Sequence, residues 1–527
     1  MTPGQWSAPE TPDARTTFLS HALSLTALHG PGPWPNGGSP LPDEQSAESQ
    51  FLNSTVLDGI RTHHGGAASE SPPVNALIDA ITAVLATPEG ESLTALHDQL
   101  ADYEALDVAD DLVEALGTLD SPREDLRSLA RWLAEHGTRR NAVALGIVML
   151  GVAGDARDQE LLSLLGALED LTLYAVVALA NTQPDRDQAI HRLACRVDGW
   201  GRIHAVERLR RTQDPDIKSW LLREGFRNRI MNEYLAHIAA TAGDLHNALL
   251  EPDIDPELLD GAAEILDALV SWGGPAADIR HYPDALPVLT RFGELLAATA
   301  PNLTRIGAAR RVKSLLLREL PPELAWSPAD VSHLLDRYTA LLAQPDWFDH
   351  VRNSLTHPAD DHDFNRALAS AADVGIDAYP HALARLRRPP HHGYVWQWVA
   401  NHTPEPEYPD LVRLACQLLP LDEIASGPEP GGGFWSSTEE HILEILLGHV
   451  VPTVEPADAL PLIRTALRAA GVRLRRIGLR ALDQLYGQAL PADCRSLVSE
   501  AMAIEPDDKL RAEFADVLER TKPGDEK

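Results

Sequence analysis

From about Val74 onward, apolar residues recur along the chain at the spacing of buried helix faces. The clearest example is residues 231–242. Five apolar residues there fall at i, i+3, i+4, i+7 and i+8: Met231, Tyr234, Leu235, Ile238 and Ala239. This spacing places them on one face of a helix. Alternating Val, Ile and Thr runs bounded by turns, which would indicate strands, do not occur. The pattern therefore predicts an all-α protein.

Helix starts are marked repeatedly by a capping side chain that is followed by proline. Four such pairs occur: Ser121-Pro122, Asp214-Pro215, Asp255-Pro256 and Ser327-Pro328. The side-chain oxygen can accept hydrogen bonds from first-turn amides, and the missing N–H of proline costs nothing there. Glu124 and Asp330 each follow a capping residue by three positions, which puts an acid in the positive first turn. Each pair predicts where a helix begins.

Four consecutive segments share one sequence pattern: an apolar helix, a turn containing Gly, Asp or Pro, and a second apolar helix. They are residues 141–168, 173–197, 203–226 and 231–253. The period is about 30 residues, which is typical of helical-hairpin repeats. Because neither helix of such a hairpin can bury its apolar face alone, neighbouring hairpins are expected to stack. A related pair follows at 472–520, with a turn at Pro491-Ala492-Asp493.

The same patterns divide the chain into five regions. The proline-rich start contains one helical stretch near Thr17–Leu28 and is otherwise expected to be irregular or to form a loose strap. The predicted regions are a largely disordered or irregular segment at 1–72, a repeat array at 73–253, a less regular helical continuation at 254–436, C-terminal repeats at 437–520 and a disordered tail at 521–527.

One segment carries a resemblance to a known repeat family. The stretch GRIHAVERLRRTQDPDIKSWLL (201–222) resembles the short HEAT-like repeats of phycobilin lyases and many scaffold proteins. The resemblance covers 141–253 well and the C-terminus weakly. It implies an α-solenoid of HEAT-like helical-hairpin repeats, which specifies a fold and not a reaction. Residues 198–236 also look like a group of bacterial proteins labelled limonene hydroxylase.

Composition and charge narrow the class of protein. At 527 residues the chain is too long for one core, and a formal charge of -33 disfavours nucleic acid and anionic lipid as partners. The chain contains no run of roughly 20 apolar residues, so no membrane span is predicted. The three cysteines, Cys195, Cys416 and Cys494, form no CxxC pair, which favours a reducing cytoplasm. The apolar stretch near Phe18 follows acids and lacks the basic start of a signal peptide.

Two basic islands interrupt this acidic chain, at 199–231 and 464–480. If the stacked repeats curve, arginines on such faces could line a groove for an acidic peptide or another anion. The candidate partner-binding residues are Arg202, Arg208, Arg211, Arg223, Arg227, Arg473, Arg476 and Arg480. The alternative is that each island pairs with acids of neighbouring helices.

Two clusters could in principle bind a metal ion. His204 with Glu207 and Glu233 with His237 lie one helical turn apart on neighbouring repeats. The tract 357–363 gathers further imidazoles and carboxylates, with His357, Asp361 and His362 as its candidates. Ordinary hydrogen bonding and helix capping are the alternatives for both clusters. We therefore predict no cofactor and assign no metal site.

Two further segments have both a ligand-binding and a structural interpretation. The glycines of 430–434 lack the strand and the Lys-Ser/Thr of a phosphate loop, so a loop capped by Ser437 is the preferred interpretation. Tyr394, Trp396 and Trp398 could form a ligand-binding wall, but a core aromatic pair is favoured.

These observations favour a cytoplasmic, non-catalytic helical-repeat scaffold that binds a protein or acidic peptide through a groove near 199–250. The first alternative is an oxidoreductase of the limonene-hydroxylase-labelled group. Such an enzyme would require a metal or cofactor, because protein side chains do not activate oxygen unaided. HEAT-like deoxyhypusine hydroxylase holds two irons through His-Glu dipeptides, and this chain has none. The second alternative is a protein similar to HEAT-like DNA glycosylases, in which the arginine islands would bind the phosphates of DNA.

Overall fold

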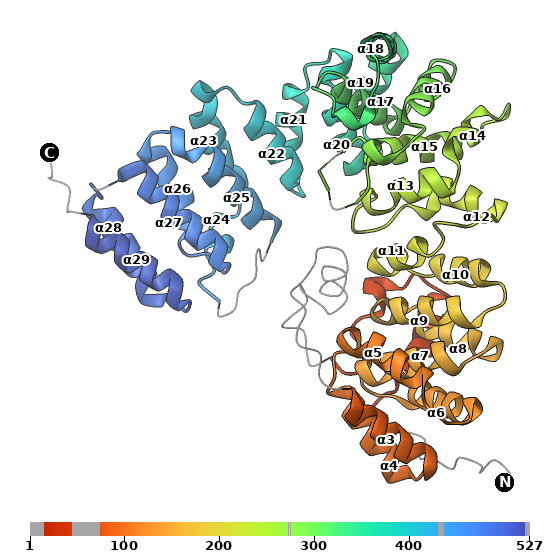
Figure 1. Cartoon of the computed structure of the whole chain (residues 1–527). Coiled ribbons are helices and arrows are strands. Elements are labelled where there is room, and N and C mark those ends of the chain that lie inside the picture. Colours follow the sequence, from red (N-terminus) through yellow and green to blue (C-terminus); the bar gives the residue numbers. More distant parts are fainter. Residues whose placement is uncertain are drawn as a thin grey trace. The chain divides into compact units, whose positions relative to one another are not determined.

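The computed structural model of the protein describes residues 15–44, 74–271, 273–274, 276–429, 437–487 and 489–521. Helices connected by turns and short loops make up these ranges, and they contain no strand. The prediction of an all-α protein is confirmed (Figure 1). The chain forms two compact units, Met1–Leu342 and Ala343–Lys527, which are described separately.

Unit 1 is an array of consecutive helices. Its helices are α1 (Phe18–His29), α3 (Asn75–Ala86), α4 (Gly90–Ala101), α5 (Ala105–Gly117), α6 (Arg123–His136), α7 (Arg140–Ala153), α8 (Gln159–Leu165), α9 (Glu169–Thr182), α10 (Arg186–Ala194), α11 (Gly199–Glu207), α12 (Pro215–Trp220), α13 (Glu233–Ala242), α14 (Leu245–Leu250), α15 (Pro256–Leu269), α16 (Ala285–Ala297), α17 (Leu303–Leu316) and α18 (Pro328–Leu342). The helices α5, α7, α9, α11, α13, α15 and α17 each pack against the next. Among the intervening helices, α8 contacts α10, and α14, α16 and α18 pack in succession.

The four predicted repeats correspond to four helix pairs. They are α7 with α8, α9 with α10, α11 with α12, and α13 with α14. The third pair differs from the others because α12 continues into a π-helical turn, η3 (Leu221–Gly225). π-helical turns are rare and often lie at functional sites. The prediction for α13 was partly wrong, since the helix begins at Glu233 and Met231 before it is 39% exposed.

The capping predictions can be compared with the observed helix starts. Asp214 accepts the amides of Asp216 and Ile217, and Asp255 accepts that of Leu258. The Ser327 hydroxyl caps α18 by accepting the Asp330 amide at 3.2 Å. Ser121 was predicted wrongly: α6 begins at Arg123, and its capping position is Pro122, which makes no side-chain cap. Pro122 occupies the capping position itself, so Ser121 lies one residue further from the helix than predicted.

Residues 15–44, termed the N-terminal strap, fold against unit 1. Thr17 caps α1, which packs on α6 and α8. The short turn η1 (Pro35–Gly38) contacts α9, and the side chains of Trp34 and Leu41 are buried. The strap is therefore an ordered part of unit 1, although it belongs to the segment predicted to be largely irregular. Residues 1–14 and 45–73 lie outside the described ranges.

Unit 2 contains the remaining helices. They are α19 (Pro345–Thr356), α20 (Asp361–Ser370), α21 (Tyr379–Leu386), α22 (Gly393–His402), α23 (Tyr408–Leu418), α24 (Leu421–Ile424), α25 (Thr438–His449), α26 (Pro456–Ala466), α27 (Val472–Tyr486), α28 (Ala492–Ile504) and α29 (Asp508–Arg520). The helices α22, α25, α27 and α29 pack in succession. The predicted turn at Pro491 separates α27 from α28, but the pair predicted for 472–520 contains three helices. The boundary between the units lies inside the predicted region 254–436.

Short 3₁₀ turns link several of these helices. They are η2 (Ala156–Asp158), η4 (Ile279–His281), η5 (Pro322–Leu324), η6 (Ala372–Val374), η7 (Glu405–Glu407) and η8 (Val451–Thr453).

Arginine–carboxylate pairs join neighbouring repeats in both units. Arg127 binds the buried Asp158, 31 residues ahead, through Nε and Nη2 at 2.8 and 2.7 Å. In unit 2, Arg475 binds Glu505 in the same way, 30 residues ahead, at 2.7 and 2.8 Å. These separations match the repeat period. Each pair therefore connects one hairpin to the next, and we call such a pair an inter-repeat clamp.

Candidate partner-binding site

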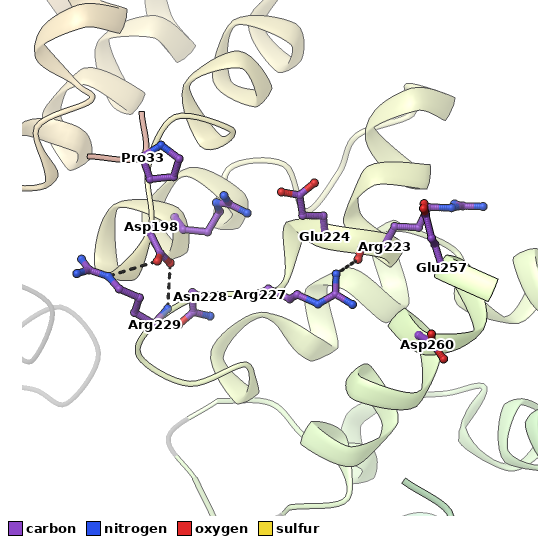
Figure 2. Close-up of a pocket in the computed structure, with 10 residues that line it drawn as sticks. Pro33, Asp198, Arg223, Glu224, Arg227, Asn228, Arg229, Glu257 and Asp260 are labelled. Atoms are coloured by element: carbon purple, nitrogen blue, oxygen red, sulfur yellow. Dashed lines mark hydrogen bonds and ion pairs between the residues drawn. The ribbon is translucent and has the colours of Figure 1, made fainter. Parts of the chain in front are cut away.

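A charged pocket of about 790 Å³ lies in unit 1, within the first basic island and the helix α15 (Figure 2). Its lining residues are Pro33, Asp198, Arg202, Arg223, Glu224, Arg227, Asn228, Arg229, Glu257 and Asp260. They come from the strap, the start of α11, η3, the loop after η3 and the first turns of α15. Four arginines and four acids make the lining formally neutral, and no lining residue is a large apolar side chain.

One side of the pocket is built on the start of α11. Asp198 precedes this helix and accepts the amides of Gly199 and Arg229 at 2.7 and 2.9 Å. Gly199 has a φ of +58°, and a Cβ there would collide with Glu169 Oε1, so this turn requires glycine. Glu169 accepts the Trp200 amide at 2.8 Å and an Arg229 Nη2 at 2.7 Å. These bonds fix the loop that carries Arg229.

Burial of the Glu169 carboxyl changes its pKa at this side of the pocket. The Glu169 side chain is only 10% exposed. Burial raises the pKa of its carboxyl, although Arg229 and the Trp200 amide act in the opposite direction. The carboxylate is therefore held in place at an electrostatic cost.

The other side of the pocket contains two arginines that pair with helix α15. Arg223 binds Asp255 at 2.5 Å, and Arg227 makes two bonds to Glu264 at 2.8 and 3.1 Å. The hydrogen bond from Arg227 to Glu264 raises the pKa of the guanidinium. Figure 2 shows that Arg227 also reaches the backbone oxygen of Arg223. For these two residues, the predicted alternative of pairing with neighbouring helices describes the contacts in the structure.

Arg202 differs from the other pocket arginines. It is 5% exposed, and its Nε donates to the Val197 oxygen at 3.0 Å. Its guanidinium carbon lies 5.4 Å from the centre of the Trp220 ring. Burial lowers the pKa of Arg202 more than the carboxylates near it raise it. No carboxylate within the described ranges forms an ion pair with this side chain.

The pocket acids divide into two groups. Asp260 binds the Arg305 Nε at 2.7 Å and the Asn302 amide at 2.9 Å. Glu224 and Glu257 are exposed, and in the described part of the chain neither lies within ion-pair distance of a cation. The pocket therefore has one buried cation and two exposed carboxylates whose charges are not matched by direct partners.

The remaining predicted arginines of the first island lie elsewhere. Arg208 and Arg211 are exposed, and they are not among the residues that line the pocket. The prediction for 199–231 therefore included three lining residues, Arg202, Arg223 and Arg227. It omitted Arg229, which nothing in the sequence distinguishes from its neighbours.

The three arginines predicted in the second island lie on α27 in unit 2. Arg473 binds Glu444 at 2.6 Å and Arg476 binds Glu513 at 2.9 Å. Arg480 is exposed, makes no ion pair with a described residue, and lines a smaller pocket of about 360 Å³. The prediction did not single out Arg475, which is buried and forms the inter-repeat clamp. Its side chain points into the core from the same helix.

The side chains of the first metal-candidate set, His204, Glu207, Glu233 and His237, do not gather into a metal site. His204 Nδ1 lies 4.0 Å from Glu207, its ring stacks on Trp200, and His237 interacts with the His281 oxygen at 3.1 Å. Glu233 is in the first turn of α13. Across the residues that the structure describes, no group of three or more His, Cys, Asp or Glu side chains is arranged to hold a metal ion.

The tract 357–363 forms the start of α20. Asp360 caps this helix by accepting the Asp363 amide at 2.8 Å. Asp361 pairs with Arg385 at 2.5 Å and with His392 at 2.9 Å, and the Arg385 bond lowers its pKa. His357 follows the end of α19, and His362 lies in the first turn of α20. The carboxylates of this tract therefore act in capping and pairing.

The aromatic group on α22 does not form a wall. Trp396 is fully buried, Tyr394 is 45% exposed, and the Trp398 ring stacks on His402 at 3.9 Å between centroids. Ser437 caps α25 as predicted, whereas the glycines of 430–434 lie outside the described ranges. No described helix is long and apolar enough to cross a bilayer.

Comparison with known proteins gives no assignment. No protein-family model matches the chain, and no curated protein matches it.

Proposed function

We propose that this protein is a non-catalytic helical-repeat scaffold that binds an acidic segment of a partner protein in the charged pocket of unit 1. The observation that carries the proposal is the lining of that pocket, in which eight of ten residues are charged. These charged residues come from the start of α11, from η3 and the loop after it, and from the first turns of α15. Pockets for small apolar molecules are lined mainly by hydrophobic side chains. A charged lining of this size fits a polar peptide segment better.

The arrangement of the pocket supports this proposal in a second way. Three of the four arginines are held by Asp255, Glu264 and Glu169, so their positions are set before a partner arrives. A preorganised surface binds with a smaller loss of conformational entropy than a flexible one. The HEAT-like resemblance of 201–222 agrees with this role, because stacked helical repeats offer extended binding surfaces.

The net charge of -33 opposes an acidic partner at long range. At physiological ionic strength, however, interactions are screened beyond about 8 Å. Contacts inside the pocket therefore decide the binding, and Arg202 provides a cation there without a paired carboxylate.

The proposal is tested with the full chain and fluorescein-labelled octapeptides in a fluorescence-anisotropy titration. The peptide (Gly-Glu)₄ is compared with (Gly-Gln)₄ at physiological salt. We expect saturable binding of the Glu peptide and weaker binding of the Gln peptide. If the two peptides bind equally, or if neither binds, the proposal is wrong.

A gain-of-function variant locates the binding. Glu257→Lys places a cation in the pocket at an exposed position that makes no described ion pair. We expect it to bind the Glu peptide about three- to tenfold more tightly. Glu160→Lys on α8 is the matched control, because Glu160 is also exposed and the charge change is identical. Equal effects of the two variants would show that net charge, and not the pocket, governs binding.

A further inference from the structure

Arg202 is an exception among the buried arginines. The other buried arginines within the described ranges are Arg127, Arg305 and Arg475. Each of these forms a short ion pair with a carboxylate: Asp158 at 2.7 Å, Asp260 at 2.7 Å and Glu505 at 2.7 Å. Arg202 is buried to the same degree and has no such partner. The fold thus satisfies its other buried guanidinium groups and leaves this one unmatched.

The neighbours of Arg202 fix the guanidinium but do not neutralise it. One bond, from Nε to the Val197 oxygen, orients the group, and the Trp220 ring lies against it. Trp220 is itself held by an edge contact with His191 at 4.6 Å between centroids. No hydrogen bond from either terminal nitrogen to a described residue is present, and Arg202 lines the pocket. Two parallel N–H donors are therefore available to a group that enters.

A buried charge without a partner is costly, and proteins normally pair or neutralise it. Arginine cannot escape this cost by losing its proton at neutral pH. The burial that lowers its pKa therefore remains as an unfavourable contribution in the unbound protein. A ligand anion would remove that contribution.

We propose that Arg202 is the anchor of this pocket and binds the carboxylate of an aspartate or glutamate side chain in the partner segment through two parallel hydrogen bonds. The inference rests on the proposed function and names its recognition chemistry. A planar carboxylate matches the fork of a guanidinium. A phosphate dianion fits less well, because four acids also line the pocket and would repel its additional charge.

The proposal also explains the exposed acids. Glu224 and Glu257 line the same pocket without an ion-pair partner in the described ranges. They disfavour a ligand that carries negative charge throughout its length. An acidic segment whose carboxylates are separated by neutral residues therefore suits the pocket better than an uninterrupted acidic run.

The test uses Arg202→Met and Arg202→Lys, with Arg208→Met as the matched control. Arg208 follows the last residue of the same helix and is exposed. We expect Arg202→Met to weaken (Gly-Glu)₄ binding at least about 30-fold, as for truncation of a buried charge pair. Arg202→Lys should also weaken binding, because an ammonium group lacks the fork. Arg208→Met should stay within about twofold of the unaltered chain.

A second readout separates this inference from the proposed function. Thermal unfolding is followed with rising sodium acetate, sodium phosphate or sodium chloride at matched ionic strength. We expect acetate to raise the Tm of the unaltered chain and of Arg208→Met, but not that of Arg202→Met. The Tm of Arg202→Met without acetate should be close to that of the unaltered chain, since no carboxylate loses its partner. This comparison shows that the variant is folded.

The outcomes are distinct. Undiminished peptide binding by Arg202→Met would overturn the Arg202 inference and leave the scaffold proposal in place. An acetate effect that depends on Arg202, without any peptide binding, would support Arg202 as a carboxylate-binding residue. It would also overturn the peptide as the ligand and point to a small carboxylate molecule instead. A phosphate effect larger than the acetate effect would overturn the carboxylate assignment.

Discussion

The clamp in unit 2 makes a quantitative prediction. Arg475 is 1% exposed, and its partner Glu505 is fully buried. Besides its two bonds to Glu505, Arg475 donates to the backbone oxygens of Ala469 and Ala470. Replacement by methionine preserves much of the apolar volume but removes all four bonds. Glu505 then retains only the Asp507 amide as a described donor.

The expected cost of Arg475→Met is about 3–5 kcal/mol, because it leaves a buried carboxylate without its cation. Hydrogen exchange measured by mass spectrometry on peptides from α27 to α29 is a suitable assay, since it reports local opening in a chain of two units. The cost corresponds to roughly two to three and a half orders of magnitude in protection. Arg480→Met, on the exposed face of the same helix, is the control and should change protection little.

A double variant tests whether the unpaired buried carboxylate of Glu505 causes the loss of stability. In Arg475→Met with Glu505→Leu, both charges are replaced by apolar groups. We expect the double variant to be more stable than Arg475→Met alone, since no buried charge remains unpaired. If Arg475→Met costs no more than Arg480→Met, or if the second substitution only adds to the loss, pairing of the two buried charges does not stabilise the repeat interface.

Three further predictions concern the frame of the pocket. Gly199→Ala should lower stability by about 1–3 kcal/mol, because it combines a positive φ with a Cβ collision; urea unfolding measures this, and Gly117→Ala, at an open helix end, should be nearly neutral. The raised pKa of Glu169 means that the native state binds its proton more tightly than the unfolded state does. Its contribution is therefore fully present at low pH and is lost as pH rises above the ordinary value of 4.5. Stability measured from pH 4 to 7 should fall for the unaltered chain relative to Glu169→Gln, and a constant difference would contradict the burial argument. Asp214→Ala should lower Tm through loss of about 1 kcal/mol of helix capping, and an unchanged Tm would show that the cap at α12 is not stabilising.

Much of the local structure follows from the sequence because its causes are local. The four repeats were predicted from apolar spacing and turn residues, and Asp214, Asp255 and Ser327 were identified as caps from the proline that follows each of them. Ser121 was misassigned because a Ser-Pro pair specifies that a helix begins nearby, but not whether the serine or the proline occupies the capping position. Boundaries of this kind depend on how the preceding loop packs.

The candidate site was predictable only in part. The basic island at 199–231 was visible in the sequence, but Arg202, Arg208 and Arg211 are equivalent there as charges. Only the folded chain shows that Arg202 is buried beside Trp220 while Arg208 and Arg211 face solvent. Glu169 was not identified because its contacts to Trp200 and Arg229 span separations of 31 and 60 residues.

The sequence by itself determined the helical class, the period of the repeats and three of the four helix starts that a capping residue and proline marked, because these depend on hydrogen bonding and apolar burial within a few turns of the chain. Tertiary structure alone decided which arginines act as inter-repeat clamps, which line the pocket, and that Arg202 is buried without a carboxylate. A charge in the sequence has no fixed energy. Its energy depends on desolvation and on the partners that neighbouring repeats bring to it, and stacking of the repeats sets both.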